Sequence, residues 1–125
     1  MILLDTDVVV DILRNHASAQ AWLQGLGTTA LGLPGLVVME LLQGCRNKFE
    51  QQRVDQFCQT HHFFWPTEPD CQRALQDFAA FHLSHNLGVL DALIAHTAVG
   101  LNEPLATFNL KHYGVIKGLT TIQPY

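Results

Sequence analysis

Short apolar runs alternate with amphipathic stretches along this chain. The first run, residues 1–4, has no polar position, as is typical of a strand buried on both faces of a sheet. Further short runs predict strands at residues 29–33, 62–65, 105–108 and 119–122. Apolar residues at helical spacing predict helices at residues 6–14, 18–26, 36–44, 49–60, from 67 onward and 90–100, with a helical turn at 111–113. Strands that alternate with helices favour an α/β fold with a parallel sheet.

Two of the predicted helices begin with capping signals. Thr6 or Asp7 is expected to cap the helix that follows the first strand. Thr67, with Asp70 three residues later, resembles a capping box at the start of the long helix. Both signals support the expected order of elements.

Length and composition exclude several classes of protein. The 125 residues predict a single domain, residues 1–125, and 48% hydrophobic residues are too many for an intrinsically disordered chain. Eleven acids against seven Lys and Arg give a net charge of −4, which excludes binding to nucleic acid by bulk positive charge. No run of about 18 uninterrupted apolar residues predicts a membrane span.

The N-terminus and the cysteines indicate a cytoplasmic protein. Asp5, Asp7 and Asp11 interrupt the N-terminal apolar stretch, so no signal peptide is expected. The three cysteines form neither a disulfide framework nor a zinc-ligand spacing, and reduced thiols in the cytoplasm are expected.

Three acids occupy unusual positions in apolar surroundings. Asp5 directly follows the first predicted strand, and ligand sites of parallel α/β sheets lie at the carboxyl ends of the strands. Glu40 lies between Val-Val-Met and Leu-Leu, and Asp91 lies between Val-Leu and Ala-Leu-Ile. Burying an ionised carboxylate without a partner is costly, so these three require a positive partner or a cleft filled with water.

Each of these acids also has a simpler interpretation. Asp5 could only cap the next helix, Asp91 could favour a helix N-terminus, and Glu40 could lie on an exposed helix face. Arg14 or Arg46 could pair with them in the folded chain. A divalent cation is the more economical explanation, because Mg²⁺ or Mn²⁺ prefers several hard oxygen ligands.

Four segments resemble the motifs of one family, the PIN domain, and in particular the VapC toxins of bacterial type II toxin–antitoxin pairs. They are residues 2–14 (ILLDTDVVVDILR), 38–44 (VMELLQG), 88–98 (GVLDALIAHTA) and 105–113 (LATFNLKHY). They occur in the family's order and cover essentially the whole chain. The resemblance implies a three-layer α/β/α fold with a twisted central parallel sheet.

The resemblance also implies an activity. Members of this family are Mg²⁺- or Mn²⁺-dependent endoribonucleases whose products carry a 5′-phosphate and a 3′-hydroxyl. Asp5, Glu40 and Asp91 map onto the acids that hold the metal and carry out catalysis. The implied partners are an RNA substrate, an inhibitory antitoxin protein and a second copy of the chain in a homodimer.

The closing motif provides supporting residues and one departure from the family pattern. Thr107 and Asn109 are expected to arrange the cleft, with Asp7 supporting the site or capping the first helix. Family members often have a further acid in this loop, where this chain has Asn109 and His112. The amide oxygen of Asn109 can still face a metal or a water molecule, although it adds no negative charge.

Two alternative functions remain open at this stage. One is a catalytically weak PIN-like protein that acts by binding its antitoxin. The other is a phosphatase of the haloacid dehalogenase class, because Asp5-Thr6-Asp7 is also a DxD motif. Candidates for contact with RNA phosphates are Arg46, Lys48, Arg53, Lys111 and Lys117.

The charge balance changes when the site acids are set aside. Without Asp5, Asp7, Glu40 and Asp91, seven acids remain against seven bases. The net charge of −4 is therefore expected to sit at the site, where a bound metal would reverse the local field.

Overall fold

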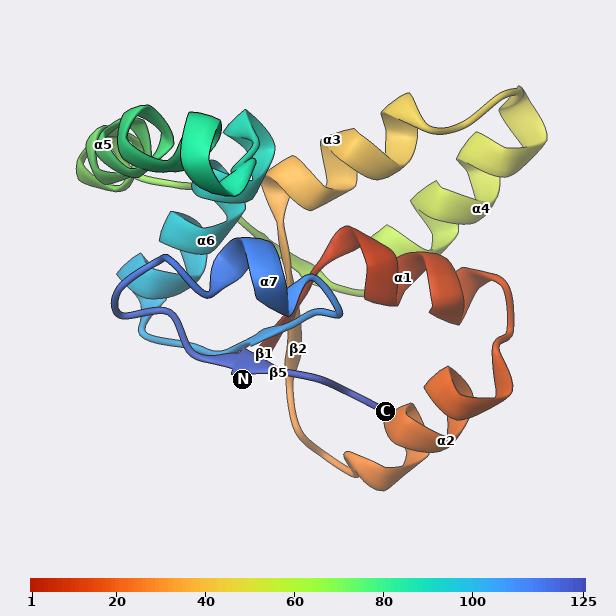
Figure 1. The fold of residues 1–125 in the computed structure, drawn as a ribbon. Coiled ribbons are helices and arrows are strands. Elements are labelled where there is room, and N and C mark those ends of the chain that lie inside the picture. The colour runs from red at the N-terminus through yellow and green to blue at the C-terminus, as the bar shows by residue number, and fades with distance from the viewer.

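A computed structural model describes all 125 residues and places five parallel strands in one sheet (Figure 1). The strand order is β3-β2-β1-β4-β5, so the first strand lies at the centre. The strands are β1 (Ile2–Leu4), β2 (Leu31–Pro34), β3 (His62–Phe64), β4 (Leu105–Ala106) and β5 (Thr121–Ile122).

Seven helices flank this sheet, which confirms the expected α/β/α fold. They are α1 (Thr6–Leu13), α2 (Ala17–Gly25), α3 (Gly35–Gln43), α4 (Lys48–Cys58), α5 (Glu68–His85), α6 (Val89–Leu101) and α7 (Leu110–Tyr113). In Figure 1, α3 and α4 form one helical hairpin and α5 and α6 form another. None of these helices has both the length and the apolar character that crossing a membrane requires.

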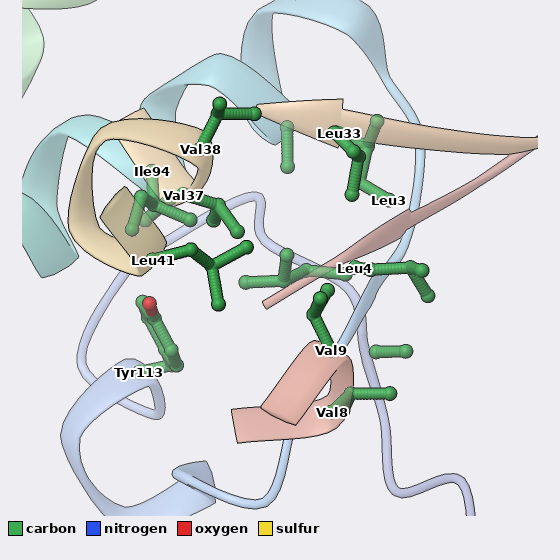
Figure 2. Close-up of a cluster of buried hydrophobic side chains, with 14 of the residues drawn as sticks. Leu3, Leu4, Val8, Val9, Leu33, Val37, Val38, Leu41, Ile94 and Tyr113 are labelled. Atoms are coloured by element: carbon green, nitrogen blue, oxygen red, sulfur yellow. The ribbon is translucent and has the colours of Figure 1, made fainter. Parts of the chain in front are cut away.

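The hydrophobic core forms around β1 (Figure 2). Leu3 and Leu4 are fully buried, which explains the uninterrupted apolar run at the start of the chain. Side chains of α1, α3, α6 and α7 pack around them, and Figure 2 shows Val9, Leu41 and Tyr113 in this cluster. The core therefore fixes the carboxyl end of β1 against four helices.

The register of the sheet brings the ends of two strands together. Leu3 and Leu4 of β1 pair with Leu105 and Ala106 of β4, and the N–H of Asp5 donates to the Ala106 carbonyl at 3.0 Å. The residues that follow β1 and β4 are therefore neighbours, although 102 positions separate Asp5 from Thr107 in sequence.

One capping prediction is wrong and the other is confirmed. The first residue of α1 is Thr6 and its N-cap is Asp5, whose carbonyl accepts the N–H of Val9 at 3.2 Å. Neither Thr6 nor Asp7 is the cap, because the chain turns into the helix directly from the strand. Thr67 caps α5 as expected and forms a reciprocal capping box with Asp70.

The boundaries of β2, β4 and β5 differ from those the apolar runs predict. Strand β2 covers Leu31–Pro34, with Pro34 paired to Phe64, whereas the run predicts residues 29–33. Strands β4 and β5 contain two residues each, and β4 ends where the chain leaves the sheet for the loop that reaches the site.

The contact between α5 and α6 depends on a glycine. Asp70 is only 5% exposed, because α6 packs over it, and it pairs with Arg73. A β-carbon at Gly100 of α6 would lie 2.3 Å from Oδ1 of Asp70. Asp70 cannot move away without leaving the Thr67 N–H or the Arg73 guanidinium.

We expect Gly100→Ala to lower the free energy of unfolding by about 1–3 kcal/mol, because the added methyl group overpacks this contact. Gly25→Ala is the matched control, since a β-carbon at the end of α2 meets no atom within 4 Å. That control should be neutral or stabilising by up to about 1 kcal/mol. Urea unfolding of both variants measures the difference, and equal stability would contradict the packing argument.

Candidate functional site

The carboxylate of Asp5 lies at the centre of the site, at the carboxyl end of β1. Its side chain is 6% exposed. Oδ2 accepts the hydroxyl of Thr107 at 2.7 Å, and Oδ1 accepts the N–H of Thr6 at 2.8 Å. The strand end, the start of α1 and the segment after β4 therefore meet on one carboxylate.

Asp7, in the first turn of α1, links this helix to the segment after β4. It accepts the N–H of Val8 at 2.7 Å and the N–H of Phe108 at 3.0 Å. Oγ1 of Thr107 in turn accepts the N–H of Asn109 at 3.0 Å. These bonds fix the loop after β4, so Thr107 and Asn109 have defined places beside the acids.

Glu40 and Asp91 come from two further helices. Glu40, near the end of α3, accepts a short hydrogen bond from the hydroxyl of Thr6. Asp91, in the first turn of α6, accepts the N–H of Gly88 at 3.2 Å. Both side chains are half-buried, unlike Asp5. Asp5 and Asp91 therefore both accept backbone N–H groups at helix starts, as well as lining the site.

The four acids line one open pocket of about 480 Å³. Its walls are formed by Asp5, Thr6, Asp7, Glu40, Asp91, Phe108 and Asn109. No Lys, Arg or His side chain lines it, and Arg46 pairs with Glu50 at 3.0 Å instead. The sequence leaves two explanations for these acids, a positive partner or a cleft filled with water. The fold places them in a cleft.

Burial acts strongly on the two N-terminal acids. Loss of water around Asp5 raises its pKa from 3.8 to about 6, although the bond from Thr107 opposes this change. Burial also raises the pKa of Asp7. Both shifts show that negative charge is costly in this pocket without a cation.

Sequence reasoning missed Tyr113, whose side chain lies beneath the site. Its ring is 1% exposed within the core (Figure 2), and its hydroxyl forms no hydrogen bond. Burial, followed by the charges of Asp5 and Asp91, raises the pKa of Tyr113. The sequence places Tyr113 only in a helical turn, because no local pattern shows which helix faces the acids.

The donor atoms of the pocket fit a hard divalent cation. Carboxylate oxygens and the amide of Asn109 are the ligands that Mg²⁺ and Mn²⁺ prefer. No three acidic, His or Cys side chains are arranged to chelate one ion directly. This spacing suits Mg²⁺, which is held by one or two carboxylates and keeps several of its water ligands.

The remaining histidines and cysteines form no second metal site. His96 is buried and its Nε2 lies 2.6 Å from Oδ2 of Asp77, which places it in the packing between α5 and α6. The cysteines are free thiols, of which Cys58 is buried.

Comparison with known proteins gives one consistent family. The family model described as PIN domain matches residues 2–117. Ribonuclease VapC10 of Mycobacterium tuberculosis is 31% identical over 121 residues, covering 95% of this chain and 90% of that protein.

Solved structures share the fold. A VapBC2 complex of Rickettsia felis bound to a promoter DNA fragment contains a chain with a TM-score of 0.79 and 23% identity, covering 98% of both chains. A DNA-bound VapBC complex of Salmonella typhimurium contains one with a TM-score of 0.81 and 17% identity, covering 97% of this chain and 96% of that one.

The raised pKa of Asp5 predicts an unusual dependence of stability on pH. Between about pH 4 and pH 6 the folded protein holds a proton that the unfolded chain has released. The stability that this proton contributes is present below pH 4 and is lost as the pH rises to 6. At neutral pH, Asp5→Asn should therefore raise the free energy of unfolding by about 2–3 kcal/mol in EDTA.

In the Asp5→Asn variant, the free energy of unfolding should also differ less between pH 4 and pH 6 than it does in wild type. Its amide oxygen can still accept the N–H of Thr6, and the Thr107 hydroxyl can turn to accept the amide group. Asp55→Asn, at an exposed position of α4, is the control and should follow wild type. Denaturant unfolding from pH 4 to 8 measures the effect. An Asp5→Asn protein less stable than wild type at pH 7 would refute it.

Proposed function

The chain belongs to the PIN domain family, and we propose that it is a metal-dependent endoribonuclease, the toxin of a type II toxin–antitoxin pair. The observation that carries the proposal is the pocket in which Asp5, Asp7, Glu40 and Asp91 meet without any cationic side chain. The 31% identity to a protein named a ribonuclease supports the activity. The products are proposed to carry a 5′-phosphate and a 3′-hydroxyl.

The residues divide the proposed chemistry between them. Asp5, directly after β1, and Asp91, in α6, would hold Mg²⁺ or Mn²⁺, and Glu40 would contact the ion through water. The chemistry that such a cation would supply is neutralisation of the scissile phosphate and a more acidic bound water for in-line attack.

Glu40 is the carboxylate best placed to orient that water and accept its proton. It is half-buried, its one protein donor is the Thr6 hydroxyl, and it lines the open pocket. Asp7 and Thr107 support the site by fixing the loop, and Asn109 offers an uncharged oxygen.

The pocket favours an enzyme over a protein that only binds its antitoxin. Burial raises the pKa of Asp5 and Asp7, which means that their ionised forms are costly in the folded protein. Neither carboxylate forms an ion pair with a base that would offset this cost. A bound divalent cation would offset part of this cost, because its two positive charges would lie among the four carboxylates. The match to the PIN family over residues 2–117 leaves no reason to retain a phosphatase of the haloacid dehalogenase class.

We also propose an antitoxin protein and a second copy of the chain as partners, and a single domain over residues 1–125. The structural neighbours named VapBC are complexes, which supports an antitoxin partner. Several large apolar side chains are exposed, including Met39 (54%), Leu75 (66%) and Val89 (55%), and this supports burial of part of the surface in assemblies.

Cleavage of RNA tests the function directly. Purified protein freed of any copurifying antitoxin should cleave structured RNA with Mg²⁺ or Mn²⁺ and should stop in EDTA. We expect Asp5→Asn, Glu40→Gln and Asp91→Asn each to slow cleavage at least about 100-fold, because each removes charge from the proposed metal site. Asp55→Asn should keep wild-type activity. Equal cleavage by all of these proteins, or none by wild type, would refute the proposal.

Metal binding has a readout that does not depend on activity. Mg²⁺ or Mn²⁺ at about 100 times its dissociation constant should stabilise wild type by about 3 kcal/mol, seen as a rise of several degrees in Tm. Asp5→Asn and Asp91→Asn should show little of this rise, whereas Asp55→Asn should show all of it. An equal rise in every variant would place the cation elsewhere.

A further inference from the structure

A second polar pocket, of about 290 Å³, lies between the end of α5 and the short helix α7. It is lined by Leu83, Ser84, His85, Asn86, Lys111 and His112. None of these residues is acidic, and three of them can carry positive charge. Its electrostatic character is therefore opposite to that of the carboxylate pocket.

The two pockets are linked by two short segments of chain. Asn86 lines the second pocket, and the chain runs from it through Gly88 to Asp91 in the first. Asn109 lines the first pocket, and Lys111 follows two residues later in the second. Two residues span at most about 7 Å, so one polymer strand can reach both pockets at once.

The polar groups of the second pocket are free to bind a ligand. Lys111, His85 and His112 form no ion pair, whereas Arg46 and Arg73 are paired with acids. The Ser84 hydroxyl lies 2.7 Å from Nδ1 of His85, which leaves Nε2 as the ring nitrogen available to a ligand. Three of these side chains, those of Ser84, His85 and Lys111, are exposed, and that of His112 is half-buried.

We propose that this pocket binds a backbone phosphate of the RNA strand next to the scissile phosphate. The inference rests on the proposed nuclease function and adds to it the place where the substrate is held. Lys111 supplies a point charge, and the side chains of His85, His112 and Asn86 supply hydrogen-bond donors to phosphate oxygens, with Ser84 orienting His85. A chain of net charge −4 repels RNA elsewhere, so a local positive site beside the metal pocket orients the strand.

Such a contact acts on substrate binding, and its test separates binding from chemistry. The variant is Lys111→Gln combined with His85→Gln. The matched control is Arg14→Gln combined with His62→Gln, two exposed residues that line neither the carboxylate pocket nor the second pocket. His112 is left intact, because its side chain is half-buried whereas those of Lys111 and His85 are exposed. We expect the variant to raise KM about 10-fold with unchanged kcat and Tm, and the control to match wild type.

Binding is measured separately with a short fluorescent single-stranded RNA, in an Asp91→Asn background that prevents cleavage. The variant should weaken binding and lower the salt dependence of log Kd by about one for each lost phosphate contact. Unchanged RNA affinity would overturn the inference. So would weakened binding of an acidic peptide with normal RNA binding, since the pocket would then serve a protein partner.

This design distinguishes the two proposals. If wild type does not cleave RNA, the nuclease proposal fails. Binding of the fluorescent RNA, measured by its fluorescence anisotropy, still tests the phosphate site in that case. If wild type cleaves and the double variant has normal KM and normal RNA affinity, only the phosphate site fails.

Discussion

Asp5 ends the central strand with a carboxylate that is 6% exposed and has hydroxyl and amide donors but no cation. Its place follows from the burial of β1 on both faces, since the strand can leave the core only at that point. Thr107 bonds to this carboxylate and also accepts the N–H of Asn109, so the loop after β4 takes its position from it. The same end of β1 starts α1, which brings Asp7 and the hydroxyl of Thr6 to the pocket.

The sequence predicts the parts of the fold and site that depend on local pattern. The apolar run of β1, the helical spacing of α5 and α6, and acids placed against apolar neighbours all reflect burial, which a single sequence displays. Helix starts are harder to predict: Asp5 is the cap because it is the single residue between β1 and α1. The sequence alone could not place Tyr113 beneath the site or show which basic residues lie beside it. Their environment is created by residues distant in sequence. Only tertiary structure shows that α7 lies beside the end of α5.

Charge in this molecule is separated over a short distance. The carboxylate pocket has no cationic lining, and the neighbouring pocket has no acidic one. A sum over the whole chain, −4, hides this arrangement. Nucleic-acid binding by such a protein would depend on where a few charges lie, because the bulk field is repulsive at low salt and is screened within about 10 Å at 0.1 M.

The strand order also has a consequence for synthesis of the chain. Strand β4 pairs directly with β1, and Phe108 and Asn109 after it complete the pocket wall. A growing polypeptide emerges N-terminus first, so the first hundred residues leave the ribosome without a closed site. Any activity of this pocket therefore begins only when translation of the chain is nearly finished.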